Sequence, residues 1–243
     1  MKRTLIIGDI HGAYQALLQV LERSKYNPNT DTLVFLGDYT DGWGETIEVL
    51  NKIIELQKEG EVISILGNHD VWLLEYLKFR VAPNIWKSQG GDIVYKRWLR
   101  FFMDDPVLAQ ETSAKHIAFL KGCHYYYEYE KDGINTLFVH AGYTKSPKKD
   151  DRHNLLWTRD MANIAMGTRN SQKPKRFKLY DKIFIGHTAT TSWNTDQPII
   201  GHNVYNVDTG AGFSGRLTCY CLETDEFWQS DLTKKLYPKE YGR

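Results

Sequence analysis

The sequence predicts an α/β fold with a parallel sheet at its core. Three apolar runs of strand length alternate with segments whose apolar residues recur at helical spacing, which is typical of right-handed βαβ units. Each of the three runs ends in a glycine followed by a polar side chain that can bind a metal. Because ligands of such sheets gather beyond the carboxyl ends of the strands, the chemistry is expected at that edge.

The elements are expected in a regular order along the chain. The first half alternates strands and helices, over residues 3–9 (strand), 13–23 (helix), 31–38 (strand), 45–58 (helix) and 61–70 (strand). Residues 71–121 are expected to form a helical insertion over one end of the sheet, within a single domain spanning 1–243. A hairpin with its turn at Asp132-Gly133 is expected over 124–142, and further strands over 182–188, 203–211 and 216–224.

Composition narrows the class of protein. The 31 Lys and Arg residues nearly balance 30 Asp and Glu, which argues against general nucleic-acid binding or a polybasic membrane surface. No apolar stretch approaches the length of a membrane span, and the first apolar run is too short for a signal peptide. Three cysteines without CxxC spacing favour a reducing compartment. A cytoplasmic protein is therefore expected.

Polar side chains with metal-binding chemistry follow five of the predicted strands. These candidate groups are Asp9, His11, Asp38, Asp41, Asn68, His69, His140 and His187. Carboxylate, imidazole and amide oxygen suit borderline divalent cations such as manganese, iron and zinc. A single Asp or His at a strand end is usually structural, but five such clusters together predict a metal site. An aspartate between two ions can bridge them, so the site could hold a pair.

The motifs "GDIHG", "GDYTD", "GNHD", "VHAG" and "GHT" resemble, in this order, those of the calcineurin-like metallophosphoesterases. The resemblance is to the phosphoprotein-phosphatase branch, which includes bacterial and phage Ser/Thr phosphatases and symmetrical diadenosine tetraphosphatases. The segments "NLLWTRD" and "YNVDTGAGFSGRLT" also resemble that group, whereas residues 71–121 match it least. The resemblance implies a β-sandwich of two mixed sheets flanked by helices, with a dinuclear metal site at the strand ends.

The resemblance also implies a role for each candidate residue. Asp38 would bridge two divalent ions, with manganese favoured and iron or zinc as alternatives. The remaining ligands would be Asp9 and His11 for one ion and Asn68, His140 and His187 for the other. His69 would act as the general acid, oriented by Asp41, and a metal-activated water would attack phosphorus. The alternative for Asp41 is a plain carboxylate at a helix N-terminus.

The second motif departs from the family pattern. Where that branch has an arginine that binds phosphate after the motif's last aspartate, this chain has Gly42. Arg159 matches another phosphate-binding position of the bacterial and phage group and is the expected replacement. Trp43 has two interpretations, a core residue that fills the vacated space or an aromatic wall beside the leaving group.

The sequence therefore predicts a metal-dependent phosphoesterase that hydrolyses phosphate monoesters, with Ser/Thr phosphoproteins as candidate substrates. The alternative enzyme is a dinucleoside polyphosphate hydrolase of the diadenosine tetraphosphatase type. An inactive phosphopeptide-binding module is the third possibility. The expected partner is thus a phosphorylated protein or a nucleotide.

Overall fold

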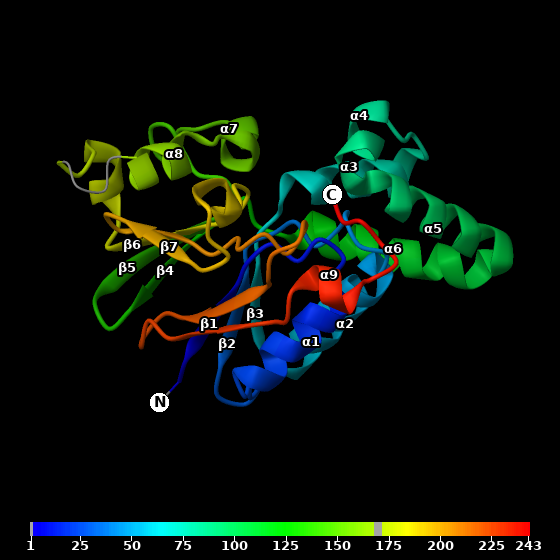
Figure 1. Cartoon of the computed structure of the whole chain (residues 1–243), viewed down its shortest axis with the longest axis horizontal. Helices are drawn as coiled ribbons and strands as arrows, with labels where there is room; N and C mark the ends of the chain where they lie inside the picture. Colours follow the sequence, from blue (N-terminus) through cyan, green and yellow to red (C-terminus); the bar gives the residue numbers. More distant parts are fainter. Residues whose placement is uncertain (1, 168–171) are drawn as a thin grey trace.

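The computed structural model describes residues 2–167 and 172–243, and two five-stranded mixed sheets form its centre (Figure 1). The first sheet has the order β10-β9-β1-β2-β3, with bounds Phe227–Gln229, Thr218–Cys221, Thr4–Ile7, Thr32–Phe35 and Glu61–Ser64. The second has the order β4-β5-β6-β8-β7, with bounds Tyr126–Lys131, Ile134–Val139, Lys182–Ile185, Val204–Asn206 and Ile199–Gly201. The β-sandwich implied by the family resemblance is confirmed.

Helices cover the outer face of each sheet, which makes four layers (Figure 1). The first sheet carries α1 (Tyr14–Arg23), α2 (Thr46–Glu59) and the short α9 (Thr233–Leu236). Beside the second sheet lie α7 (Arg152–Trp157) and α8 (Asp160–Gly167). Short helical turns occur at Lys175–Leu179 (η2) and Thr190–Trp193 (η3). No helix in the described part of the chain is long and apolar enough to cross a membrane.

Alternation along the strands explains the layers. Leu5 and Ile7 of β1 face α1 and α2, whereas Ile6 between them faces the second sheet. In the second sheet, Leu137 and Val139 belong to the core under α7 and α8, and Phe138 fills the space between the sheets. Both faces of these strands are apolar because both are covered, so their sequences are continuous hydrophobic runs.

The helical segment lies at one end of the sandwich (Figure 1). It contains α3 (Asn68–Phe79), α4 (Asn84–Trp86), a kinked turn η1 (Lys87–Gly91), α5 (Asp92–Asp104) and α6 (Pro106–Gly122). Helix α3 begins at Asn68, so the prediction of a strand through residue 70 was wrong by several residues. The cause is that Asp70 accepts a hydrogen bond from the backbone N–H of Gly67 and caps the helix.

The short strands β7 and β10 were not predicted. Each has three residues and lies at the edge of its sheet, so it carries too little hydrophobic pattern to be recognised. The predicted hairpin is confirmed, with Asp132 and Gly133 both at positive φ between β4 and β5.

Candidate active site

The candidate ligands gather where the parallel strands of the two sheets end. Strands β1, β2 and β3 run parallel in the first sheet, and β5, β6 and β8 run parallel in the second. Their carboxyl-terminal loops supply Asp9, Asp38 and Asn68 from one sheet and His140 and His187 from the other. Each of these side chains is buried.

Hydrogen bonds tie the loops of the first sheet together. The backbone N–H groups of Ile10 and His11 both donate to the carbonyl of Asp38, at 3.0 and 2.9 Å. The carboxylate of Asp70 accepts from the N–H groups of Asp38, Tyr39 and Gly67, each at 2.8 Å. Asp70 thus organises the second and third loops, a role that its position after His69 did not reveal.

Several site residues have the left-handed backbone conformation that non-glycine residues rarely adopt. His11, Asp38, Asp41 and His187 have φ values of 50°, 50°, 74° and 65°. Each such residue costs about 1–3 kcal/mol and persists only where its surroundings enforce it. The concentration of this strain in the loops that carry the ligands is typical of a functional site.

The first group of ligand atoms consists of Asp9, His11 and Asp38, whose donor atoms lie within 4.8 Å of one another. His11 Nδ1 lies 2.9 Å from the carbonyl of Thr40, so Nδ1–H donates there. The lone pair of Nε2 is then available to a cation bound between His11 and the two carboxylates. Asp9 Oδ1 and Asp38 Oδ2 are buried and have no hydrogen-bond partner among the described residues. Unpaired buried carboxylate oxygens are costly unless a cation binds them.

The second group shares Asp38 with the first and adds His140 and His187. His140 Nδ1 lies 2.9 Å from the carbonyl of Leu36, and His187 Nε2 lies 3.2 Å from the carbonyl of Trp157. The other ring nitrogens, His140 Nε2 and His187 Nδ1, face the centre as candidate metal-binding atoms. Asn68 Oδ1 lies 3.0 and 2.9 Å from those two nitrogens. Two nitrogens and one amide oxygen therefore converge beside the shared Asp38.

Missing side chains at two glycines make room for the ligands. A Cβ at Gly67 would overlap the carboxylate of Asp38, and a Cβ at Gly186 would overlap that of Asp9. Any larger residue at either position would displace a candidate ligand. The strand-end glycines of the sequence motifs therefore have a steric function here.

The charges of the buried groups indicate affinity for cations. Burial and the neighbouring carboxylate of Asp208 raise the pKa of Asp9 well above its usual range. Burial opposes ionisation of His140, yet the carboxylates of Asp38 and Asp9 raise the pKa of its imidazole to about 10. Buried acids without enough positive charge retain protons, and a divalent cation can replace those protons. The donor set thus fits the divalent metals that the family resemblance implies.

Asp208 is a further buried carboxylate of the centre. It follows β8, as the other ligands follow their strands, and burial raises its pKa to about 6. One of its oxygens accepts a hydrogen bond from the N–H of Gly210 at 3.1 Å. Asp208 was not among the ligands predicted from the sequence, although its position just after a predicted strand was a usable signal.

His69 and Asp41 form a close buried pair, as the resemblance implied. His69 Nδ1 lies 2.6 Å from Asp41 Oδ2, and Trp86 Nε1–H donates to the same oxygen at 2.8 Å. Burial lowers the pKa of His69 to about 3 and raises that of Asp41 well above its usual range. A buried site favours a neutral acid beside a neutral imidazole over a carboxylate beside an imidazolium. The neutral pair and the pair of a carboxylate with an imidazolium contain the same number of protons.

Arg159 lies at the edge of the centre, where its Nη1 donates to the carbonyl of His187 and to Thr188 Oγ1, both at 3.2 Å. It lines a cavity of about 300 Å³ with His187, Phe213 and Arg243. Both hydrogen-bond acceptors of Arg159 are neutral, so its positive charge remains available to an anion in that cavity.

Trp43 lies in the core, with no exposed surface. Its ring stacks on Tyr237 at a centroid distance of 5.1 Å, and its Nε1–H donates to the carbonyl of Ala211 at 2.7 Å. This placement corresponds to the core interpretation and gives Trp43 no free face for a leaving group. The aromatic neighbour of His69 is instead Trp72, whose ring lies edge-on at 5.0 Å and contacts Trp157.

Neither of these half-buried tryptophans was predicted from the sequence as a site residue. Trp72 lies three residues after His69 on α3, a spacing that places the two side chains on one helix face. Trp157 precedes Arg159 by two residues and presents its ring edge to His187, with centroids 6.3 Å apart. Helical spacing from His69 was the signal that could have identified Trp72.

Comparisons with known proteins agree with this geometry. A family model described as calcineurin-like phosphoesterase matches residues 2–210. Serine/threonine-protein phosphatase 2 of Escherichia coli K12 is 27% identical over 222 residues, covering 90% of this chain and 92% of that protein. The symmetrical bis(5'-nucleosyl)-tetraphosphatase of Xylella fastidiosa M23 is 40% identical over an alignment of 269 residues, covering 90% and 87%.

Solved structures show the same fold. The cold-active protein-tyrosine phosphatase of a Shewanella species superposes with a TM-score of 0.58 at 17% identity, covering 94% of this chain and 77% of that one. The chain therefore belongs to the calcineurin-like phosphoesterase family. It is a metallophosphoesterase, a hydrolase acting on phosphoric ester bonds, as the sequence predicted.

Proposed function

We propose that this protein is a two-metal phosphate monoesterase, with Asp38 shared between the ions. The observation that carries the proposal is the shared carboxylate, because Asp38 belongs to both groups of converging donor atoms. One ion would be held by Asp9, His11 and Asp38, and the other by Asp38, Asn68, His140 and His187. The donor set of nitrogen and oxygen without thiolate favours manganese, with iron or zinc as alternatives. Two such ions supply an activated water and neutralise charge on the phosphoryl oxygens.

His69 would deliver the proton to the leaving oxygen. Its Nδ1 faces Asp41, which leaves Nε2–H as the acid, and the proton held by Asp41 can move to Nδ1 as Nε2 releases its own. Trp86 Nε1–H donates to the same oxygen of Asp41 and helps to fix its carboxyl group. Arg159 would bind a phosphoryl oxygen at the cavity edge. These residues thus supply acid catalysis and orientation in a buried site.

Phosphorylated serine or threonine is the substrate class that we propose first. Such leaving groups are poor and depend on a general acid, which the His69–Asp41 pair provides. The test is steady-state hydrolysis of phosphoserine peptides by the manganese-loaded protein, with Asp9→Asn as the inactive reference. Absence of turnover in the loaded wild type, with phosphopeptide binding retained, would favour a binding module instead.

A dinucleoside polyphosphate hydrolase is the second candidate. The half-buried Trp72 beside His69, and Trp157 next to Trp72, favour it, since aromatic side chains can stack on a nucleobase. The 40% identical Xylella relative carries that description. Diadenosine tetraphosphate assayed beside the phosphopeptide separates the two candidates. Trp72→Ala should reduce turnover of the dinucleotide more than turnover of the peptide if the nucleotide is the substrate.

A further inference from the structure

Arg243 reaches the centre from a distant part of the sequence. Its Nη1 lies 2.8 Å from His11 Nε2, one of the candidate metal-binding nitrogens. Its guanidinium also lies over the ring of Phe213, at 5.1 Å from the centroid. Together with Arg159 and His187 it lines the cavity of about 300 Å³. Two guanidinium groups therefore border one cavity at the edge of the ligand cluster.

The stem of Arg243 runs through a slot formed by glycines. A Cβ at Gly90 would lie 2.7 Å from Arg243 Cγ, and a Cβ at Gly42 would lie 3.3 Å from the same atom. A Cβ at Gly212 would lie 3.2 Å from Arg243 Cδ. Gly42 and Gly90 both have positive φ, and Gly42 N–H donates to the carbonyl of Gly90 at 3.0 Å. The space without a side chain at residue 42 is therefore occupied by Arg243.

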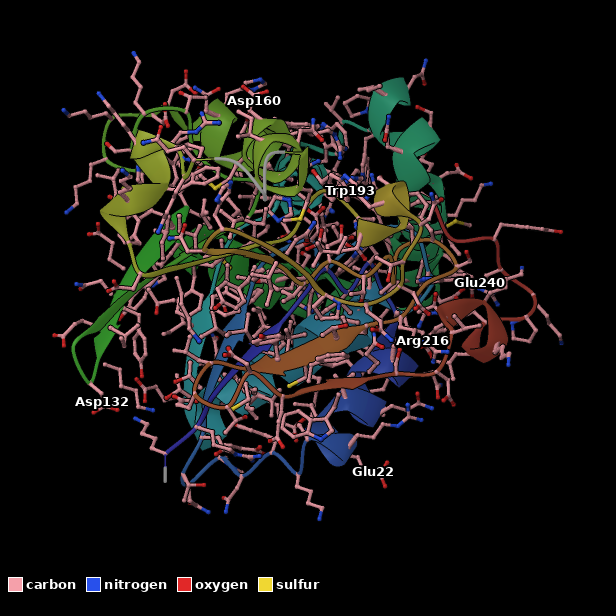
Figure 2. All side chains as sticks on the ribbon, turned by 60° about the vertical axis from the view of Figure 1, so that its left-hand side comes forward. Glu22, Asp132, Asp160, Trp193, Arg216 and Glu240 are labelled. Carbon is pink, nitrogen blue, oxygen red and sulfur yellow. The ribbon has the colours of Figure 1, made fainter. Side chains whose placement is uncertain are left out.

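The segment that carries Arg243 is fixed to the loop of the second motif. Tyr237 stacks on Trp43, and Glu240 Oε2 accepts a hydrogen bond from the N–H of Gly44 at 2.7 Å. The backbone N–H of Arg243 donates to the carbonyl of Gly212 at 2.8 Å. Figure 2 labels Glu240 on this red segment, beyond α9. The position of the guanidinium is thus set by contacts along the whole segment.

The guanidinium of Arg243 opposes the rise in the pKa values of the buried Asp41 and Asp208 but forms no ion pair with either. Within residues 2–167 and 172–243, neither Arg243 nor Arg159 forms an ion pair with a carboxylate. His11 Nε2 has one lone pair, which can accept from Arg243 or bind a metal ion but not both. With a metal ion on that nitrogen, Arg243 would lose this contact and its guanidinium donors would be available at the cavity.

We propose that Arg243 is a phosphate-binding residue, which acts with Arg159 to hold the phosphoryl oxygens of the substrate. This inference rests on the proposed function. A guanidinium presents a planar fork that donates two parallel hydrogen bonds to a tetrahedral oxyanion, whereas an ammonium group acts as a point charge. Arg243 would thereby replace the phosphate-binding arginine that the family branch has at the position of Gly42.

The test is calorimetric binding of inorganic phosphate to the manganese-loaded full chain. Arg243→Ala should weaken phosphate binding about 10- to 100-fold, the range for hydrogen bonds to charged groups, and Arg243→Lys should fall between. Manganese affinity, titrated separately, should be retained or increased, because the competitor for His11 Nε2 is gone. The exposed Arg100→Ala, which breaks only an ion pair with Asp104 on α5, serves as the matched control.

A second variant keeps the guanidinium of Arg243 but crowds its side chain. Gly42→Ala should displace the stem of Arg243 and also weaken phosphate binding, since its Cβ would crowd Cγ. Unchanged phosphate affinity in Arg243→Ala would overturn the inference, as would a parallel loss of manganese binding, which would indicate a structural role. If the wild type binds phosphate through Arg243 but hydrolyses no ester, the proposed function fails and the inference stands. If Arg159→Ala alone weakens phosphate binding in an active enzyme, the inference fails and the function stands.

Discussion

The strand-end loops and the helical segment α3–α6 both reach Asp41, but they contribute in different ways. The loops carry candidate metal ligands, with strained backbone at Asp38 and unpaired buried oxygens at Asp9 and Asp38 among the described residues. The helical segment contributes Asn68 and His69 from the first turn of α3. It also forms hydrogen bonds with the second loop, including Trp86 Nε1–H to Asp41 and Gly42 N–H to the carbonyl of Gly90. The polar chemistry therefore lies in the strand-end loops and the first turn of α3, and the rest of the helical segment supports the second loop through packing and hydrogen bonds.

The largest effect should come from the shared ligand in the loops. Asp38→Asn should abolish binding of at least one metal ion and reduce kcat more than 100-fold, since residues that merely orient a ligand are already worth about 10- to 100-fold. Metal content of the purified protein and steady-state kinetics measure this. The control Asp132→Asn changes a carboxylate with a similar backbone conformation at the far hairpin tip (Figure 2) and should leave both unchanged.

The second effect concerns the acid. His69→Gln should lower kcat about 100- to 10,000-fold for an alkyl phosphate, and far less for p-nitrophenyl phosphate, whose leaving group needs no proton. Comparison of the two substrates by steady-state kinetics measures it, with His124→Gln outside the centre as control. Equal losses on both substrates would remove His69 from the role of acid.

The link between the two regions can be broken at Trp86. Trp86→Phe removes the hydrogen bond to Asp41 and should lower kcat about 10- to 100-fold. Trp98→Phe is the matched control, because Trp98 is equally buried in the same segment but its Nε1 has no hydrogen-bond partner among the described residues. Equal activity in the two variants would show that the hydrogen bond from Trp86 to Asp41 does not support catalysis.

The smallest effect should be a pH dependence of the free energy of unfolding that arises from His116 in the helical segment. Burial lowers the pKa of His116 to about 3, and its Nε2–H donates to Asn51 Oδ1 at 2.9 Å. An unfolded histidine titrates near 6.5, so the unfolded chain binds the extra proton between pH 6.5 and 3. The stability contributed by the neutral ring is complete above pH 6.5 and is lost as the pH falls.

The free energy of unfolding contributed by His116 should fall by about 1.4 kcal/mol at pH 5.5 relative to pH 8. Urea unfolding of the wild type and of His116→Phe at both pH values measures it, because other titrating groups cancel in the difference. Identical pH dependence of the two proteins would show that His116 is protonated in the folded state.

The sequence was sufficient to predict the loops but not their support. Asp9, His11 and Asp38 follow buried strands whose apolar runs are unambiguous, so their convergence follows from the rules of parallel sheets. Trp86 and Arg243 could not be found this way. Each reaches the centre through tertiary packing of segments far from the motifs, and no local pattern records such contacts.

Trp43 illustrates the same limit in the opposite direction. Its position beside Asp41 in the sequence predicted proximity to the substrate as one alternative, yet its ring turns into the core against Tyr237. A side chain near a candidate site residue in the sequence can point either way from a turn. Only the packing of the segment near residue 237 decides the direction.

The left-handed conformations at Asp38 and Asp41 have a consequence for engineering. Glycine adopts this conformation without the penalty of about 1–2 kcal/mol that other residues incur. Asp38→Gly or Asp41→Gly would therefore relieve both backbone strain and repulsion between buried acids. An inactive, metal-free variant could then be more heat-resistant than the metal-free native chain, a stability–activity trade-off located in individual residues.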